Sequence, residues 1–302
     1  MISRIKHIKK DWLLAGLLIS PSVIAIGIFV YGFIGWSIRV SFSKWKGLVA
    51  NYAWAGWSNY QKLFGDPRFH IDVRNTLYFT AFFLTGAIVV GLTTAILLDR
   101  GIPGEAVFRS IYLFPMAISF IVTGVVWRWL MNPATGTRTS GLNLLFKDAG
   151  LGVLANNWHT THPPWGITFV ALPAVWQMSG FMMALFLGGL RSIPDDLREA
   201  ARVDGASELQ IYRRVILPLL RPVALSAVII LGHISLKIFD LIVAMGGAGD
   251  LRLDMPSIYM WTTTFDAFNY ARGATIGLLL LVGVALLVVP YLFFSLREES
   301  GV

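Results

Sequence analysis

Residues 274–296 read ATIGLLLLVGVALLVVPYLFFSL, a run of 23 residues without a single charged side chain. A helix needs about 20 mostly apolar residues to cross the hydrocarbon core of a bilayer. Lipid offers no hydrogen-bond partner to an open strand, so an apolar run of this length is expected to be helical. This stretch therefore predicts a membrane-spanning helix close to the carboxyl end of the chain.

Five more segments of the chain meet or approach the same length and composition. They are Trp12–Ile38, Leu77–Leu98, Ile111–Leu130, Ile167–Leu190 and Pro222–Met245. Hydrophobic residues make up 56% of the chain and charged residues 14%, whereas a soluble domain carries about 25% charged residues. The sequence predicts an all-α, polytopic membrane protein with six transmembrane helices. We expect a single transmembrane domain over residues 1–302, with a core over 72–296.

The basic residues of the chain predict its orientation in the membrane. Arg4, Lys6, Lys9 and Lys10 precede the first apolar run, which is longer than the ~7–15 residues of a signal peptide and indicates a retained span. Segments 1–11, 99–110, 191–221 and 297–302 together hold 13 Lys and Arg residues. The much longer segments 39–76, 131–166 and 246–273 hold 10. Basic residues favour the cytoplasmic side, so both termini are predicted to be cytoplasmic.

Several classes of function are excluded or disfavoured by composition and motifs. The chain has no cysteine, which excludes disulfides and thiolate metal sites. Its net charge of +8 comes from clusters beside the spans, which indicates membrane topology and not nucleic-acid binding. His159 and His162 have no acidic residue close by, so we expect no metal site. There is no phosphate-binding Gly-x-x-x-x-Gly-Lys-Ser/Thr loop, so ATP and Mg are expected to bind to another chain.

The segment 191–221 is predicted to form two short cytoplasmic helices joined by a turn. Pro194 suits the first position of a helix, and Gly205 tolerates the left-handed conformation that ends one. Ser207 and Gln210 form a capping-box pattern that starts the second helix. Pro218 and Pro222 follow where the chain is expected to bend into the fifth span. These residues alone leave two interpretations open, a docking element for a partner or an ordinary connection.

A resemblance to a known family decides between these interpretations. The succession Glu199-Ala200-Ala201, then Asp204-Gly205-Ala206, then Ile216-Leu217-Pro218 resembles the EAA loop of binding-protein-dependent ABC importer permeases. In that family the loop docks in a cleft of the ATP-binding subunit. The resemblance therefore implies a type I ABC importer permease fold. It also implies that Glu199, Ala200, Ala201, Asp204 and Gly205 couple the spans to ATP hydrolysis on a partner.

Three runs within the spans are similar to the sugar branch of that family. They are Ile111 to Ala117, Trp176 to Phe181 and His233 to Asp240, and they are most similar to glucose/mannose-type permeases. The similarity to the maltose and glycerol-phosphate type rests on Pro115, Trp176, Gly188-Gly189-Leu190 and Phe239-Asp240-Leu241. The branch often has Gly-Gly-Pro where this chain has Gly246-Gly247-Ala248, which leaves the shape of that loop open.

The resemblance implies a non-catalytic subunit of a sugar importer in a bacterial or archaeal inner membrane. Its implied partners are a second homologous permease, a dimer of ATP-binding subunits, an extracytoplasmic sugar-binding protein, the sugar and membrane lipid, with no nucleic acid. Glucose or mannose is the expected substrate. A disaccharide, a glucoside or a modified sugar remains the alternative.

Polar residues within the spans are candidates to line the translocation path. The resemblance implies that substrate lies midway across the membrane near Trp176, Gln177, Ser235 and Asp240. Lys237, three residues before Asp240, is expected to share its helix face and to pair with it. The remaining candidates are Met116, Ser119 and His233.

Each of these candidates also has a plain structural interpretation. Lys237 can extend to the membrane surface, Gln177 can bond to another helix and Trp176 can pack between helices. A different class of function, an ion-coupled secondary transporter, would use Lys237 and Asp240 as an ion relay.

Overall fold

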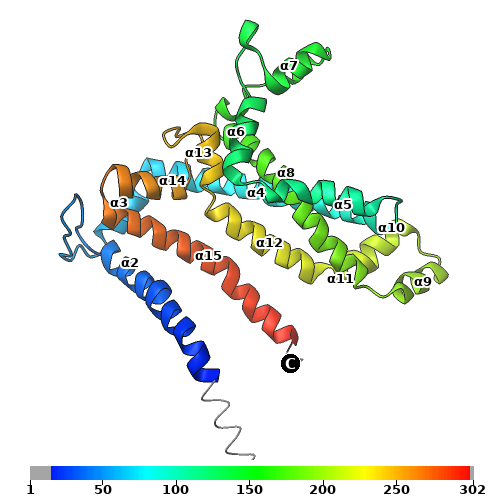
Figure 1. Cartoon of the computed structure of the whole chain (residues 1–302), viewed down its shortest axis with the longest axis horizontal. Helices are drawn as coiled ribbons and strands as arrows, with labels where there is room; N and C mark the ends of the chain where they lie inside the picture. The colour runs from blue at the N-terminus through cyan, green and yellow to red at the C-terminus, as the bar shows by residue number, and fades with distance from the viewer. Residues whose placement is uncertain (1–14, 300–302) are drawn as a thin grey trace, which may run out of the picture. The chain divides into compact units, whose positions relative to one another are not determined.

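The computed structural model describes residues 15–299, with side chains described up to residue 293. The basic amino-terminal segment, the start of the first span at Trp12 and both chain ends lie outside this range. The described chain is almost entirely helical (Figure 1), and its only strand-like pairing is the isolated bridge between Ser43 and Trp54. The chain divides into two compact units. Unit 1 contains residues 15–64 and 260–278, and unit 2 contains 65–259 and 279–299.

Four helices are long and apolar enough to cross a membrane without interruption. They span Ala15–Ser41, Pro67–Asp99, Trp165–Arg191 and Tyr270–Phe293. Two further helix pairs are bent, Glu105–Ala117 with Phe120–Leu130 by 97° and Glu208–Leu219 with Arg221–Leu236 by 63°. The prediction of an all-helical membrane protein is thereby confirmed, and the predicted six spans are reached when each bent pair counts as one span.

Unit 1 is built from the first span and a short aromatic loop. The span ends in α2 (Phe33–Ser41), and α3 (Ser58–Phe64) follows the loop. Phe42 stacks on Trp54 with a centroid distance of 5.2 Å, and Trp45 packs on Tyr270 at 4.7 Å. Such aromatic groups suit the boundary between membrane and water.

Helices α4 (Pro67–Asp99) and α8 (Trp165–Arg191) pack along each other and form the core of unit 2 (Figure 1). Gly86 and Gly91 allow this close approach, because a side chain at either position would collide with Val175 or Met182. Helix α4 begins about three turns before the predicted Leu77. The reason is the cap at Asp66, whose carboxylate accepts a hydrogen bond of 2.9 Å from the Arg68 backbone.

The third span was predicted as one helix, and that prediction is wrong. Helix α5 (Glu105–Leu113) and the short turn η2 (Phe114–Ala117) meet α6 (Phe120–Leu130) at an angle of 97°. Ile118 adopts an extended conformation, and the Ser119 hydroxyl caps α6 by accepting from the Val122 N–H at 3.3 Å. Pro115 and the Ser119 cap thus end one helix and start the next.

The fifth span is also interrupted, contrary to the prediction of a continuous helix over Pro222–Met245. Helix α12 (Arg221–Leu236) ends before Lys237, and α13 (Asp240–Gly246) begins three residues later. Helix α13 packs on α6, where Gly124 lies directly against Ala244 and Leu241. The second halves of the two broken spans therefore support each other.

The remaining elements are short helices, the predicted two-helix segment and the last span. They are α7 (Gly141–Asp148), the two-helix segment α9 (Asp195–Val203) and α10 (Glu208–Ile211), α11 (Leu217–Leu219), α14 (Pro256–Trp261) and α15 (Tyr270–Glu299). The segment 131–166 is mostly irregular outside α7. Asn143 holds it together by accepting from the Trp158 indole N–H at 2.8 Å and donating to the backbone oxygens of Asn132 and Asn156.

Candidate functional site

The segment of α9 and α10 has the structure that the sequence predicts. Gly205 has a φ of +78°, the left-handed conformation that favours glycine. The Ala206 N–H donates to the Ala201 carbonyl at 3.0 Å, which closes the helix end. The Ser207 N–H donates to the Gln210 side chain at 2.8 Å and completes the predicted capping box. The turn between the two helices is therefore rigid.

Three ion pairs lie within or beside this two-helix segment. Arg198 of α9 pairs with Asp99 at the end of α4, with 2.9 Å between nitrogen and oxygen. Arg191 at the end of α8 pairs with Glu105 of α5 at 2.7 Å. Arg202 and Glu208 pair across the turn at 2.9 Å. The Arg198–Asp99 pair thereby joins α9 to α4, which packs along α8.

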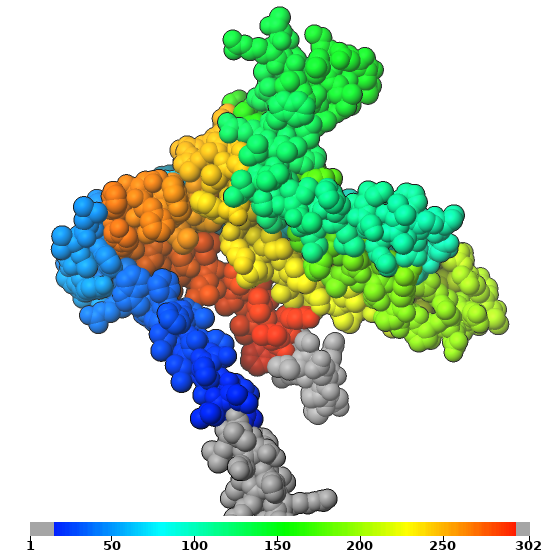
Figure 2. Space-filling view, viewed as in Figure 1, coloured from blue at the N-terminus to red at the C-terminus, as the bar shows by residue number. Residues whose placement is uncertain are grey.

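The outward surface of α9 and α10 is exposed and partly apolar. Val203 is 88% exposed and Leu209 is 68% exposed. Apolar surface rimmed by polar residues is typical of interaction sites. Glu199, Ala200, Asp204 and Gly205 are exposed beside them, and Ala201 is half-buried. In Figure 2 this yellow-green segment forms one end of unit 2 and is not covered on the viewed face. The combination of apolar groups and carboxylates suits a protein partner.

The candidate lining residues separate into exposed and enclosed groups. Met116, Ser119, Lys237 and Asp240 are exposed at the two helix breaks, and Trp176 is 40% exposed. The Trp176 ring packs on Trp127 with a centroid distance of 5.9 Å. His233 is half-buried.

Lys237 and Asp240 do not share a helix face, so that expectation is wrong. Lys237 follows the end of α12 with φ −112° and ψ 13°, and Asp240 starts α13. The three-residue spacing places side chains together only while the helix continues. None of the ion pairs in the described part of the chain joins these two residues.

Gln177 and Ser235 are buried and bond within the protein. The Gln177 amide donates to the Ile118 carbonyl at 2.6 Å, and Ser235 accepts from Thr80 of α4 at 3.0 Å. The Ile118 carbonyl lies at the break in the third span, where a helix would have supplied its partner. Ser257, which sequence reasoning missed, donates in the same way to the Ile238 carbonyl at the other break, at 2.5 Å. Side chains thus satisfy the backbone that both breaks expose.

Replacement of Gln177 by leucine is expected to destabilise the protein by about 1–2 kcal/mol, because the Ile118 carbonyl then loses its donor. The measurement is the unfolding midpoint of the purified protein in detergent. Ser179→Ala is the matched control, since Ser179 bonds only to Trp176 in its own helix. An unchanged midpoint for Gln177→Leu would show that another donor reaches this carbonyl.

Sequence reasoning also missed a buried polar cluster in unit 2. Arg68 pairs with Asp254 at 2.5 Å and lies over the Tyr259 ring, 4.3 Å from its centroid. Tyr259 donates to Asp66 at 2.6 Å, and Asn75 donates to the Asp254 carbonyl at 2.9 Å. The cluster connects the start of α4 to the segment before α14. The only signal in the sequence was the Asp66-Pro67 helix start.

His159 lies in the outer segment with a 6% exposed side chain. Burial lowers the pKa of this imidazole, and the nearby Arg128 charge lowers the pKa further. Among the described residues, no group of three or more His, Asp or Glu side chains is placed to hold a metal ion.

The stability of the protein is expected to fall as the pH drops below about 6.5, because His159 binds a proton more readily when unfolded. When the pKa of a histidine is lower in the folded protein than in the unfolded one, the histidine stabilises the fold fully at pH values above the unfolded pKa. This stabilisation is lost as the pH falls below that pKa. Unfolding midpoints between pH 8 and pH 5 measure this slope. His159→Gln should flatten the slope, whereas His162→Gln, an exposed histidine of the same segment, should not. Equal slopes for both variants would show that His159 does not cause the pH dependence of stability.

The helical fold, the broken spans and the exposed two-helix segment define a membrane transport subunit, and comparisons with known proteins agree. The family model described as "binding-protein-dependent transport system inner membrane component" matches residues 87–297. The chain belongs to this family. Its members are transport components, so the chain is not an enzyme.

Two curated relatives and one solved structure illustrate the similarity. A probable ABC transporter permease protein of Pyrococcus horikoshii is 39% identical, covering 94% of this chain and 96% of the relative. The xylose/arabinose import permease protein of Haloferax volcanii is 34% identical, covering 91% and 86%. A bacterial ABC transporter that imports alginate has a chain with a TM-score of 0.78 and 23% identity, covering 97% of this chain and 98% of that chain. The last similarity shows the same permease fold.

Proposed function

We propose that this chain is one permease subunit of an ATP-driven sugar importer. Several relatives are named for sugars, among them xylose/arabinose, trehalose/maltose and multiple-sugar permeases. The observation that carries the coupling role is the rigid, exposed pair of α9 and α10, with its capped turn at Gly205. In this proposal an ATPase dimer, which binds ATP and Mg, docks on that pair from the cytoplasm. Both termini then lie on the same side.

The proposal assigns two groups of residues. Glu199, Ala200, Ala201, Asp204 and Gly205 contact the ATPase, supported by their position on the outward surface. Trp176, Met116, Ser119, His233, Lys237 and Asp240 line the path, supported by their full or partial exposure at or near the breaks. Gln177 and Ser235 act by holding the backbone of the path in place, because their polar atoms already bond within the protein.

One chain supplies six spans, and a second homologous permease completes a central path in this proposal. An extracytoplasmic binding protein delivers the sugar. Glucose or mannose is the proposed substrate, based on the three sequence runs of the sugar branch. A disaccharide is the alternative substrate, because one relative, 27% identical, is the trehalose/maltose transport system permease protein of Thermococcus litoralis.

Uptake into proteoliposomes tests this function. The vesicles contain the chain with its partner permease, ATPase and binding protein, and labelled glucose, mannose, maltose and xylose are compared. We expect uptake that requires enclosed ATP and is highest for one monosaccharide. Uptake by the chain alone, driven by an ion gradient, would instead support a secondary transporter.

A further inference from the structure

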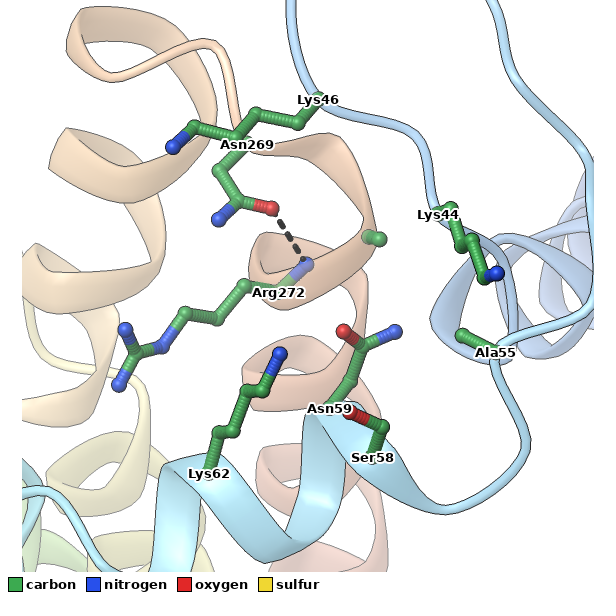
Figure 3. A pocket seen from close by; sticks show the side chains of 9 residues that line it. Lys44, Lys46, Ala55, Ser58, Asn59, Lys62, Asn269 and Arg272 are labelled. Atoms are coloured by element: carbon green, nitrogen blue, oxygen red, sulfur yellow. Dashed lines mark hydrogen bonds between the residues drawn. The ribbon is translucent and has the colours of Figure 1, made fainter.

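Unit 1 contains a cavity of about 410 Å³ between the loop after the first span, α3 and the start of α15 (Figure 3). The lining includes four basic residues, Lys44, Lys46, Lys62 and Arg272. The neutral residues of the lining are Ala55, Ser58, Asn59, Asn269 and Ala271. No acidic side chain is among the described residues that line this cavity.

The three lysines of this lining have few acidic residues near them in unit 1. Residues 15–64 contain no Asp or Glu, and the other segment of the unit, 260–278, contains one, Asp266. Within the part of the chain that the structure describes, none of the ion pairs involves Lys44, Lys46 or Lys62. Arg272 lies in the first turn of α15, where the helix dipole favours negative charge. Such a concentration of positive charge attracts an anion.

Hydrogen bonds hold the walls of this basic pocket in place. The Gly47 N–H donates to the Phe268 carbonyl at 2.7 Å, and the Ala271 N–H donates to the Trp45 carbonyl at 3.0 Å. Asn59 donates to the carbonyls of Ser41 and Ser43 at 2.7 and 2.8 Å. The backbone that carries the basic side chains is therefore organised before any ligand arrives.

The position of the pocket along the chain places it at the level of lipid headgroups. The first span ends at Ser41, and the last span begins at Tyr270. Both ends lie within three residues of the lining residues Lys44 and Arg272. Trp45 packs on Tyr52 and Tyr270 with centroid distances of 5.3 and 4.7 Å, and such aromatic groups occupy the membrane interface.

We propose that this pocket binds the phosphate group of an anionic membrane lipid. Lysine side chains supply charge-assisted hydrogen bonds to phosphate oxygens, and the Ser58 hydroxyl supplies a neutral donor. In the orientation of the proposed function the pocket faces the outer side of the membrane. Four basic residues between 39 and 62 are then unexpected on topological grounds, because basic residues favour the cytoplasmic side. Recognition of an outer-leaflet phospholipid accounts for them.

The test measures which lipids remain bound to the purified full chain with its partner subunits. Native mass spectrometry compares phosphatidylglycerol with phosphatidylcholine, each added to delipidated protein. The variant with Lys44, Lys46 and Lys62 replaced by glutamine is expected to bind phosphatidylglycerol at least about tenfold more weakly. The variant with three arginines should retain binding. Lys147→Gln, an exposed lysine of another outer segment, is the matched control.

Three outcomes would overturn the proposal. One is equal retention of phosphatidylglycerol by the wild-type protein and the triple glutamine variant. A second is binding of inorganic phosphate as tight as that of the lipid, which would indicate a free-anion site. A third is weaker capture of the binding protein by the triple variant in membranes of phosphatidylcholine alone, which would indicate an acidic protein partner. Lipid retention is independent of transport, so it can fail or succeed separately from the proposed sugar uptake.

Discussion

Replacement of Glu199 by alanine is expected to reduce ATP-driven sugar uptake at least about tenfold while the transporter complex still assembles. Glu199 is exposed on α9, two turns from the rigid bend at Gly205. When α9 docks on the ATPase, the Glu199 carboxylate accepts charge-assisted hydrogen bonds from donors of the ATPase. Removing it leaves those donors buried without an acceptor, which costs about 2–5 kcal/mol in similar interfaces.

The matched control is Asp196→Ala, one turn earlier on the same helix. Asp196 is also exposed and acidic, so both variants remove one charge from α9. The measurements are uptake, ATP hydrolysis and recovery of the complex by size-exclusion chromatography. Normal uptake with Glu199→Ala would remove this residue from the coupling mechanism. A complex that falls apart would show that Glu199 contributes to assembly, and uptake would then need to be measured per assembled complex.

The helix pair around Gly205 was predictable because its determinants are local. A left-handed glycine and a capping box act over three or four residues, and the structure contains both. The long spans were predictable for a similar reason, since apolar length alone determines whether a helix can cross a bilayer. Helix ends were less accurate where a cap such as Asp66 extended α4 beyond the apolar run.

The broken spans were not predictable, because their causes lie far apart in the sequence. The break at Ile118 is stabilised by Gln177, and the break at Ile238 by Ser257. A polar residue inside an apolar run indicates some role, but it does not identify which backbone group it will meet. The same limit applies to Lys237 and Asp240, whose spacing suggested a pair only for an unbroken helix.

Replacement of Arg68 by methionine is expected to destabilise the protein by about 3 kcal/mol. Arg68 is the cation of the buried cluster, and its partner Asp254 is only 3% exposed. Asp72 lies beside them with no exposed surface, and no described donor reaches its carboxyl oxygens. Without Arg68, two buried carboxyl groups would face each other with no opposing charge.

The measurement is the unfolding midpoint in detergent, with Arg138→Met as the matched control. Arg138 is exposed, and it takes part in no ion pair in the described structure. The double variant Arg68→Met with Asp254→Asn should recover at least half of the loss, because the uncompensated charge is then gone. If the double variant is as unstable as the single one, Arg68 contributes through packing on Tyr259 and not through its charge.

The loss of Arg68 is expected to reach the fifth span as well. Asp254 and Ser257 lie three residues apart, and Ser257 donates to the Ile238 carbonyl at the break. Release of Asp254 loosens the segment that carries Ser257, so the break loses its donor. Hydrogen exchange of the backbone amides of residues 254–258 measures this loosening. Arg68→Met should speed the exchange, whereas Arg138→Met should leave it unchanged, because Arg138 belongs to a different segment of unit 2.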